Sequence, residues 1–254
     1  AETEPAIRDR LLLFVAEAIS SFLPGGLRTD VHDQVLATTI RLSRETQDAD
    51  AWRSYTRAFI AEFAARGGDE YEATVRGFAA SDNPDITWRA RRALAARGLV
   101  DAGVVEAWRS ADGSGEAARM SVEALASLPI EEARSHAWDS VYSETLSNDF
   151  LTATLAGLQA SSWDGEAGIE AAVDRLRSYW ESHTIGMALR YANGVLAYGL
   201  DIDRDGSVER SVGLLRSWLD TNGDAPAQLR RIVIEHLDAF ERDERVQRRW
   251  KQDQ

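Results

Sequence analysis

The 254-residue chain contains no cysteine and a single lysine, Lys251, so that arginine carries almost all of its positive charge. The absence of cysteine excludes a disulfide framework and thiolate chemistry. Long apolar runs are missing too: residues 11–16 form the longest early run, far short of the roughly 18 apolar residues that a transmembrane helix needs. This run also lacks the basic flank and the cleavage site of a signal peptide. We therefore expect a cytoplasmic protein with no membrane partner.

A strongly basic surface is absent as well. The chain carries 29 Lys and Arg residues against 42 Asp and Glu residues, which gives a formal net charge of −13 at pH 7. Binding to nucleic acid needs a concentrated basic face. The two arginine-rich segments, residues 89–92 and 242–249, are interleaved with acids or lie close to them, which is typical of solvated helix faces. We predict no nucleic-acid partner.

The sequence contains no convincing alternating strand pattern of five or more residues bounded by turn residues. Apolar residues recur instead at steps of three and four, which places them on one face of a helix. This periodicity predicts an all-α protein. The clearest faces comprise Ile7, Leu11, Phe14, Ala18 and Phe22; then Trp52, Tyr55, Phe59 and Phe63; and finally Leu229, Val233, Leu237 and Phe240.

Helix-breaking residues divide these segments at short intervals. The Pro-Gly-Gly of residues 24–26 is predicted to end the first helix, and the Gly-Gly of residues 67–68 the third. Asp85 is the predicted N-cap of a helix over residues 86–97, and Gly98 is the glycine expected to end it. These breaks predict about a dozen helices of roughly 10 to 18 residues, joined by short loops.

Successive amphipathic helices joined by tight turns stack as antiparallel pairs into curved arrays. We therefore predict an all-α, HEAT- or armadillo-like superhelical array of antiparallel helices, irregular because no strict sequence repeat is visible. No Gly-, Ser- or Pro-rich linker divides the chain. Residues 1–254 are expected to form a single helical domain.

The histidines are not spaced for a zinc hydrolase of the H-E-x-x-H type. Such an enzyme holds zinc with two histidines at i and i+4 on one helix face, and a Glu beside the first activates water. Here no histidine is directly followed by a Glu, and no two histidines lie within five residues of each other. We assign no catalytic and no cofactor-binding residue. The histidines are His32, His136, His183 and His236.

The segment Gly113-Ser114-Gly115 imitates two catalytic or binding motifs without matching either. It lacks the outer glycines of a nucleophile elbow. A dinucleotide-binding loop must follow a strand, whereas this segment follows residues with a helical pattern. We interpret it as a helix cap.

One weak candidate for a metal site remains, a cation loop that contains Asp201, Asp203 and Asp205. With the glycine that follows, these residues reproduce the first half of a calcium-binding loop, in which carboxylates surround a hard cation. The position that should hold a bidentate Glu is Val212, so a large share of the coordination is missing. The alternative interpretation is a polar loop in which Asp205 or Ser207 caps the following helix.

Three blocks of sequence carry a resemblance to a known family. The first is Asp85-x-x-Trp88-Arg89 followed by LAARGLVD, the second spans residues 112–117, and the third runs from Ala137-Trp138 to Leu146-Ser147-Asn148. In this order they resemble the C-terminal helical domain of an actinobacterial aminopeptidase N, a gluzincin zinc metallopeptidase. The resemblance covers about residues 71–250. In the second block this chain has Ser and Ala where the family usually has Thr and Gly.

The resemblance implies a HEAT-like bowl, like the helical domain of endoplasmic-reticulum aminopeptidases, that packs on the catalytic domain of the same polypeptide. Such a bowl caps the active-site chamber and restricts which peptides enter. The zinc would belong to that catalytic domain, so this chain is expected to be the non-catalytic part of a longer hydrolase. We also expect a concave surface of net negative charge that attracts the protonated N-terminus of a peptide substrate.

Two other functions stay open. A free-standing HEAT-like scaffold would bind a protein partner and would have no peptidase domain beside it. A small calcium-responsive module would instead depend on the loop from Asp201 to Glu209.

Overall fold

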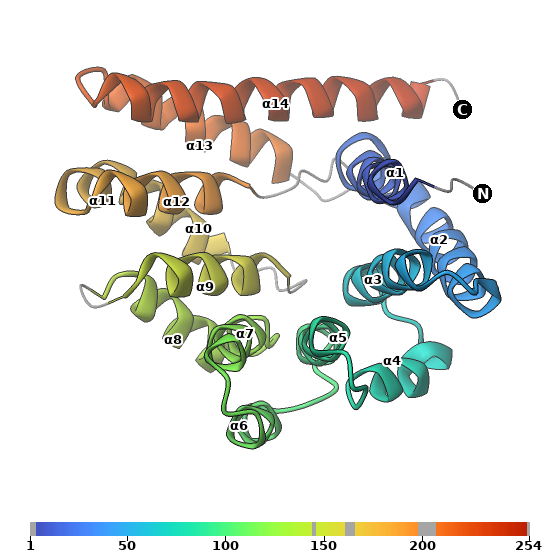
Figure 1. Ribbon diagram of the computed structural model, residues 1–254. Coiled ribbons are helices and arrows are strands. Elements are labelled where there is room, and N and C mark those ends of the chain that lie inside the picture. The colour runs from blue at the N-terminus through green and yellow to red at the C-terminus, as the bar shows by residue number, and fades with distance from the viewer. Residues whose placement is uncertain (1–3, 144–145, 161–165, 198–206, 253–254) are drawn as a thin grey trace.

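The computed structural model describes residues 4–143, 146–160, 166–197 and 207–252. It is 83% helical, with fourteen α-helices, and no strand occurs in the described part of the chain. The all-α prediction is therefore confirmed (Figure 1). The helices are α1 (Pro5–Glu17), the π-helical segment η1 (Ala18–Phe22), α2 (Gly25–Glu45), α3 (Ala49–Arg66), the 3-10 turn η2 (Asp69–Tyr71), α4 (Glu72–Phe78), α5 (Pro84–Ala96), α6 (Ala102–Ala111), α7 (Gly115–Ala126), α8 (Glu131–Val141), α9 (Asn148–Ala160), α10 (Glu166–Asp174), α11 (Leu176–Ser182), α12 (Ile185–Leu196), α13 (Ser207–Thr221) and α14 (Ala227–Gln252).

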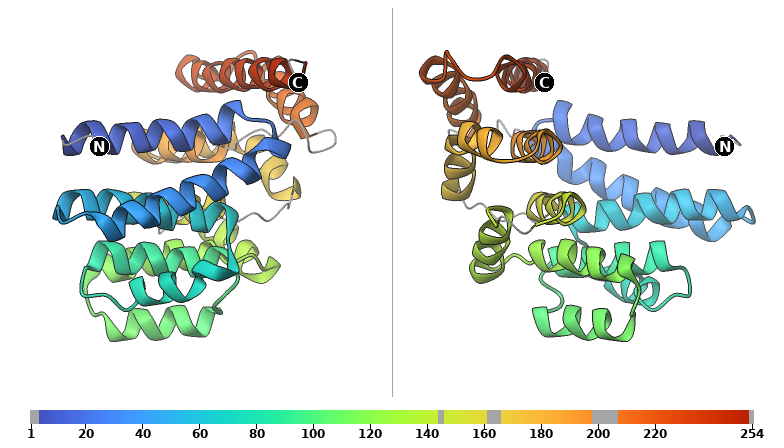
Figure 2. Two further views of the ribbon diagram at one scale, coloured as in Figure 1. Left: turned by 90° about the vertical axis from the view of Figure 1, so that its right-hand side faces the viewer. Right: turned by 60° about the vertical axis from the view of Figure 1, so that its left-hand side comes forward.

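The helices form two rows that follow each other around the molecule. In the inner row α3 packs on α5, α5 on α7, α7 on α9, α9 on α12 and α12 on α14. The outer row packs on the inner one, with α4 on α5, α6 on α7, α8 on α9 and α13 on α14. Figure 2 shows the successive layers from α6 to α14. This arrangement of helix pairs is the predicted irregular HEAT-like array.

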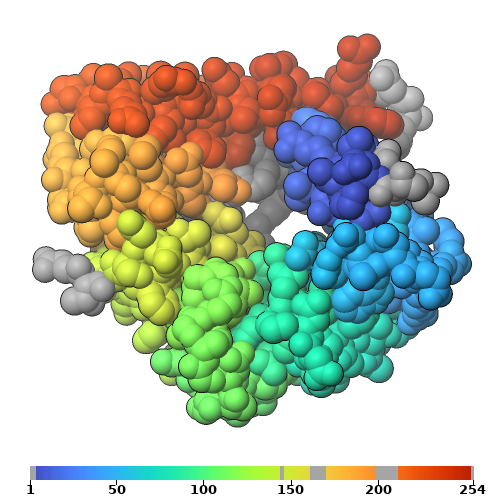
Figure 3. All heavy atoms as spheres, in the orientation of Figure 1, coloured from blue at the N-terminus to red at the C-terminus, as the bar shows by residue number. Residues whose placement is uncertain are grey.

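The two ends of the array meet, so that the inner row closes into a ring. The π-helical segment η1 packs against α14, while α1 packs on α3. The side chain of Gln247 on α14 donates a hydrogen bond of 2.8 Å to the carbonyl oxygen of Ser21 on η1. The space-filling view shows the ring of helices around a central hollow beside α1 (Figure 3).

Two large apolar cores lie in the two halves of the ring, and a smaller one lies between them. Phe59 and Phe63 are central to the core of the first half, which α2 to α5 supply. Tyr191 and Trp218 belong to the core of the second half, to which helices from α8 to α14 contribute. The small core contains Leu128 and lies where α5, α6 and α7 meet. Burial of these apolar surfaces is the main force that holds each half together.

Helix ends around α5 follow from local chemistry, with one difference from the prediction. Gly98 ends the helix with φ +65°, and the amide of Leu99 bonds the carbonyl of Leu94, which is the predicted glycine C-cap. The N-cap, however, is Asn83, whose side chain accepts from the amide of Ile86. The prediction of Asp85 as the cap was wrong because Pro84 takes the first helical position.

The first helix differs from the prediction in two ways. Its apolar residues do lie on a helix, but Ile7, Leu11 and Phe14 are 50%, 50% and 48% exposed. Its one buried residue is Arg8, whose guanidinium lies over the ring of Tyr55 at 5.7 Å from the centroid. The apolar face of α1 is therefore turned away from both large cores.

The first helical segment ends directly before the Pro-Gly-Gly of residues 24–26, as predicted, and the same residues also begin the next helix. The α-helical turns of α1 end at Glu17 and continue as η1 to Phe22. Pro24 is then the N-cap residue of α2, and its carbonyl accepts from the amides of Leu27 and Arg28. The glycines thus begin the second helix. No helix in the described part of the chain is long and apolar enough to cross a membrane.

Candidate functional site

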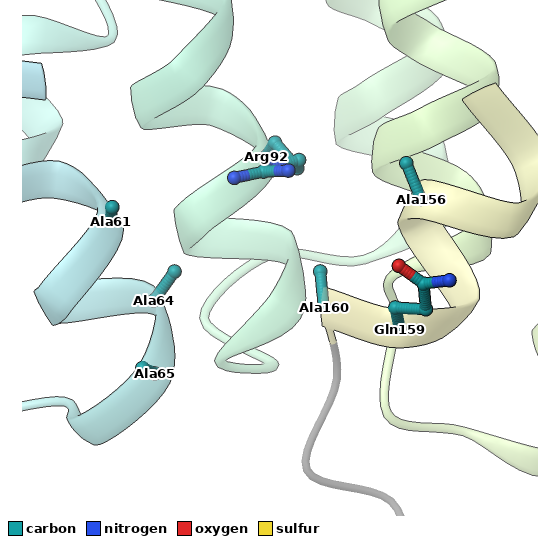
Figure 4. A pocket seen from close by; sticks show the side chains of 7 residues that line it. All are labelled: Ala61, Ala64, Ala65, Arg92, Ala156, Gln159 and Ala160. Atoms are coloured by element: carbon teal, nitrogen blue, oxygen red, sulfur yellow. The ribbon is translucent and has the colours of Figure 1, made fainter. Parts of the chain in front are cut away.

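The inner side of the ring carries three adjoining hollows, and the first lies at its centre. This hollow has a volume of about 450 Å³ and opens between α3 and α9. Both walls are made mostly of alanine, and Arg92 reaches in from α5 between them (Figure 4). The small alanine side chains leave space between the two walls. The lining residues are Ala61, Ala64, Ala65, Arg92, Ala156, Gln159 and Ala160.

The second hollow, of about 440 Å³, lies between α5 and α7 and shares Arg92 with the first. An ion pair forms part of its lining, with 2.6 Å between Arg92 Nη1 and Glu123 Oε1. Glu123 is also 3.9 Å from Arg119, and Arg119 contacts Glu116 one turn earlier on α7. The hydrogen bond from Arg119 lowers the pKa of Glu116. Because the charges are already paired, the lining is held in place before any ligand arrives.

The third hollow, of about 340 Å³, lies between α1 and α3 and shares Arg89 with the second. Asp85 accepts from Arg57 Nε at 2.7 Å and from Arg89 Nε at 2.8 Å, which ties α3 to α5. Burial alone would raise the pKa of Asp85, but these two hydrogen bonds outweigh it and lower the pKa. The aspartate therefore stays ionised and keeps both arginines in position.

The apolar part of this third hollow comes from α1 and α3, and a buried acid lies beside it. Glu62 is 5% exposed and contacts His32 Nδ1 on α2. Leu12 and Leu13 of α1 supply larger apolar side chains than the alanines of α3. The hollow can therefore receive an apolar group more readily than the other two.

The charged side chains of the lining are mostly paired, and five acids stand against four arginines. Arginines and acids alternate along α3, α5 and α7, and most are paired with each other. Paired charges of opposite sign produce a weak field beyond the wall, so they attract a cationic peptide end less than unpaired acids would. The charged lining residues are Arg57, Arg89, Arg92 and Arg119 with Asp9, Glu62, Asp85, Glu116 and Glu123.

The residues that carry the family resemblance connect helices, cap helix ends and stack on neighbouring rings. The indole of Trp88, which is 2% exposed, donates to Asp112 Oδ2 at 3.0 Å and so joins the first two blocks. This hydrogen bond is the main cause of the lowered pKa of Asp112. Ser114 caps α7 by accepting from the amide of Ala117, as predicted. In the third block, Trp138 stacks on Tyr142.

A second cluster of polar aromatic groups lies in the second half of the ring. Tyr179 stacks on Tyr191 with 4.0 Å between the ring centroids, and the Tyr142 and Tyr191 hydroxyls are 3.4 Å apart. Burial raises the pKa of Tyr179 to about 12 and also raises that of Tyr191. Both phenols are therefore neutral at pH 7. They serve as part of the core rather than as bases.

The candidate cation loop with Asp201, Asp203 and Asp205 lies outside the described residues. Within the described residues, no group of three or more His, Asp or Glu side chains is arranged to hold a metal ion. The histidines point to separate neighbours: His32 contacts Glu62, and His183 stacks on Tyr179.

Sequence reasoning missed the residues that line the hollows. Arg57 pairs with Asp85 and Arg92 with Glu123, so each pair joins helices that are distant along the chain. The repeat of Ala61, Ala64 and Ala65 on α3 is a local signal, but small residues are common wherever helices pack closely. Comparison with protein-family models and with curated proteins found no match.

Proposed function

We propose that the chain is the non-catalytic C-terminal domain of a zinc aminopeptidase, where it caps the active-site chamber and gates the access of peptides. The main support is the set of three adjoining hollows on the inner side of a helical ring. The proposed family is based on the three sequence blocks that resemble the aminopeptidase N helical domain. Zinc and the catalytic residues would belong to the catalytic domain of the same polypeptide.

The hollows offer a peptide two kinds of contact. Each has the size of one or two side chains, so a peptide would bind through several of them at once. The alanine walls and Leu12 and Leu13 would receive apolar side chains. The guanidinium groups of Arg89 and Arg92, fixed by their acidic partners, would donate hydrogen bonds to peptide carbonyls.

Peptide binding by this chain can be tested with a variant that fills the central hollow. Ala61→Trp adds a large ring at an exposed position of α3 beside that hollow. Ala107→Trp is the matched control, because Ala107 is an exposed residue of the outer helix α6. With a mixture of random decapeptides, calorimetry should give about tenfold weaker binding for Ala61→Trp and unchanged binding for Ala107→Trp. Equal binding by both variants would place the peptide elsewhere.

The enzymatic part of the proposal has its own test. The coding sequence that is continuous with residue 1 should encode an H-E-x-x-H motif. The zinc-loaded full polypeptide should release the N-terminal residue from peptides, whereas this chain alone should bind them without cleavage. A gene without that motif would contradict the proposal.

A free-standing HEAT-like scaffold is the second candidate, and one observation favours it. The apolar residues of α1 are exposed, with Leu13 at 63%. Terminal helices of repeat arrays usually present a polar outer face. A scaffold predicts a stable protein partner on α1, with no peptidase encoded beside it.

A further inference from the structure

The ring closes at a joint that we call the seam, formed by η1 and the last turns of α14. Gln247 is fully buried there, and its side chain donates to the carbonyl oxygen of Ser21, which is 226 positions away in the sequence. The contact is therefore between the first and the last parts of the array. The remaining joints of the inner row are between helices with only one or two other helices between them along the chain.

The seam differs from the other joints in its chemistry. Asp243 is 9% exposed on the same side of α14, and its carboxylate bonds the Ser21 side chain. Burial raises the pKa of Asp243, and the charge of Glu17 acts in the same direction, while Arg242 opposes it. Buried polar groups contribute much less net stability than apolar surface of the same size. Ile19 is buried at the seam but belongs to none of the three apolar cores of the described residues.

The backbone at the seam is also unusual. The residues Ala18–Phe22 form a π-helical turn directly after the α-helical turns of α1. Such turns are rare in proteins and are frequent at functional sites, because they are less stable than an α-helix. The segment ends at Phe22, and its C-cap residue Leu23 lies directly before the N-cap Pro24 of α2.

The seam lies across the ring from the joints that α7 makes with α5 and α9 (Figure 1). The two walls of the central hollow belong to opposite halves, since Ala61 and Ala64 come from α3 and Ala156 and Ala160 from α9. A movement at the seam, with the α7 joints as a hinge, changes the separation of these walls. Hinged closure of two packed bodies around a ligand is a common mode of conformational change.

We propose that the seam is a releasable joint, at which the ring opens and closes around the central hollow. Its role in gating peptides rests on the proposed function. The opening itself is a property of the ring and can be measured without any ligand, so that either proposal can fail while the other stands.

The absence of cysteine makes the test direct, because introduced cysteines are the only sites that a thiol-reactive spin label can modify. Labels at Ser20→Cys and Arg245→Cys, two exposed positions on η1 and α14, report the distance across the seam. Labels at Ser217→Cys and Asp238→Cys, on the packed pair α13 and α14, form the control pair. Pulsed electron paramagnetic resonance gives the distance distribution of each pair.

Two variants weaken the seam without touching the apolar cores. Gln247→Ala removes the hydrogen bond to Ser21, and Gln247→Glu also adds a carboxylate near Asp243. Gln159→Ala is the matched control, because Gln159 donates a similar bond to the carbonyl of Gly194 within one half. Loss of one such bond should raise the population with the longer seam distance about two- to tenfold. The rise should be larger in Gln247→Glu than in Gln247→Ala.

The proposal of a releasable seam is supported if the seam distance lengthens in the Gln247 variants, while the distance of the control pair and the seam distance in Gln159→Ala stay unchanged. An unchanged seam distance in both Gln247 variants overturns it. A change in the seam pair and the control pair together also overturns it, because that result indicates general loosening of α14.

Discussion

The two halves of the ring meet at two joints that differ in chemistry. At the α7–α9 joint the helices approach so closely that a Cβ on Gly157 would lie 2.3 Å from the carbonyl oxygen of Glu123. At the seam, Gln247 and Asp243 meet the polar groups of Ser21. Close apolar packing is sensitive to every added or removed atom, whereas a polar contact can exchange its hydrogen bonds with water. The comparison indicates one permanent joint and one weaker joint.

The largest effect is expected when a buried apolar side chain is shortened in the small core between the two halves, and a smaller one when this is done at the seam. Leu128, in that small core, is 1% exposed, and Ile19, on η1, is 2% exposed. Leu128→Ala should lower the free energy of unfolding by about 2–5 kcal/mol. Ile19→Ala should cost less, because Ile19 lies outside the three apolar cores of the described residues. Urea denaturation measures both, and equal losses would contradict the difference between the joints.

A smaller loss is expected when the close approach of α7 and α9 is disturbed. Gly157→Ala places a methyl group against the carbonyl of Glu123 and 2.7 Å from Ala126 Cβ, so the helices must separate. This overpacking should cost about 1–3 kcal/mol. Gly213→Ala is the control, since a Cβ on Gly213 of α13 meets no atom within 4 Å. Thermal unfolding should show that the control is more stable than the wild type, by about 0.5–1 kcal/mol.

The smallest effect concerns pH and the charge at the seam. The raised pKa of Asp243 lies above its ordinary value of 3.8, so the folded protein binds this proton more tightly than the unfolded chain does. The associated stability is present below pH 3.8 and is lost as the pH rises through the folded-state pKa. Asp243→Asn cannot lose a proton and should be more stable than the wild type at pH 7.

The stability difference between Asp243→Asn and the wild type should shrink as the pH is lowered toward 3.8. Urea denaturation at several pH values between 4 and 7 tests this expectation. Asp238→Asn, at an exposed position of the same helix, is the control. A difference that stays constant with pH would show that the charge of Asp243 does not destabilise the seam.

The sequence was sufficient to predict the helices and the array, because both depend on local patterns. The buried face of Leu229, Val233 and Leu237 on α14 follows from three- and four-residue spacing. The left-handed conformation of Gly98 follows from the position of that glycine after a helix. Both signals lie within a few residues of the structure that they specify.

The candidate site could not be predicted in the same way. The walls of the central hollow, such as Ala61 and Ala156, come together only when the ring is complete. Closure brings together Gln247 and Ser21, for which no local pattern exists. The burial of Arg8 could not be predicted either. Helical spacing shows which residues of α1 share a face, but it does not show which face a neighbouring element covers.

The position of the seam along the chain determines how the protein would bear mechanical load. Glu17, the last residue of α1, is followed directly by η1, and Gln247 lies in the last turns of α14. A pulling force applied between the two chain ends would therefore pass through α1, the seam and the last turns of α14. The large cores around Phe59 and Tyr191 would bear no tension until the seam had broken. The ring would first lengthen into an open arc with its two halves still folded.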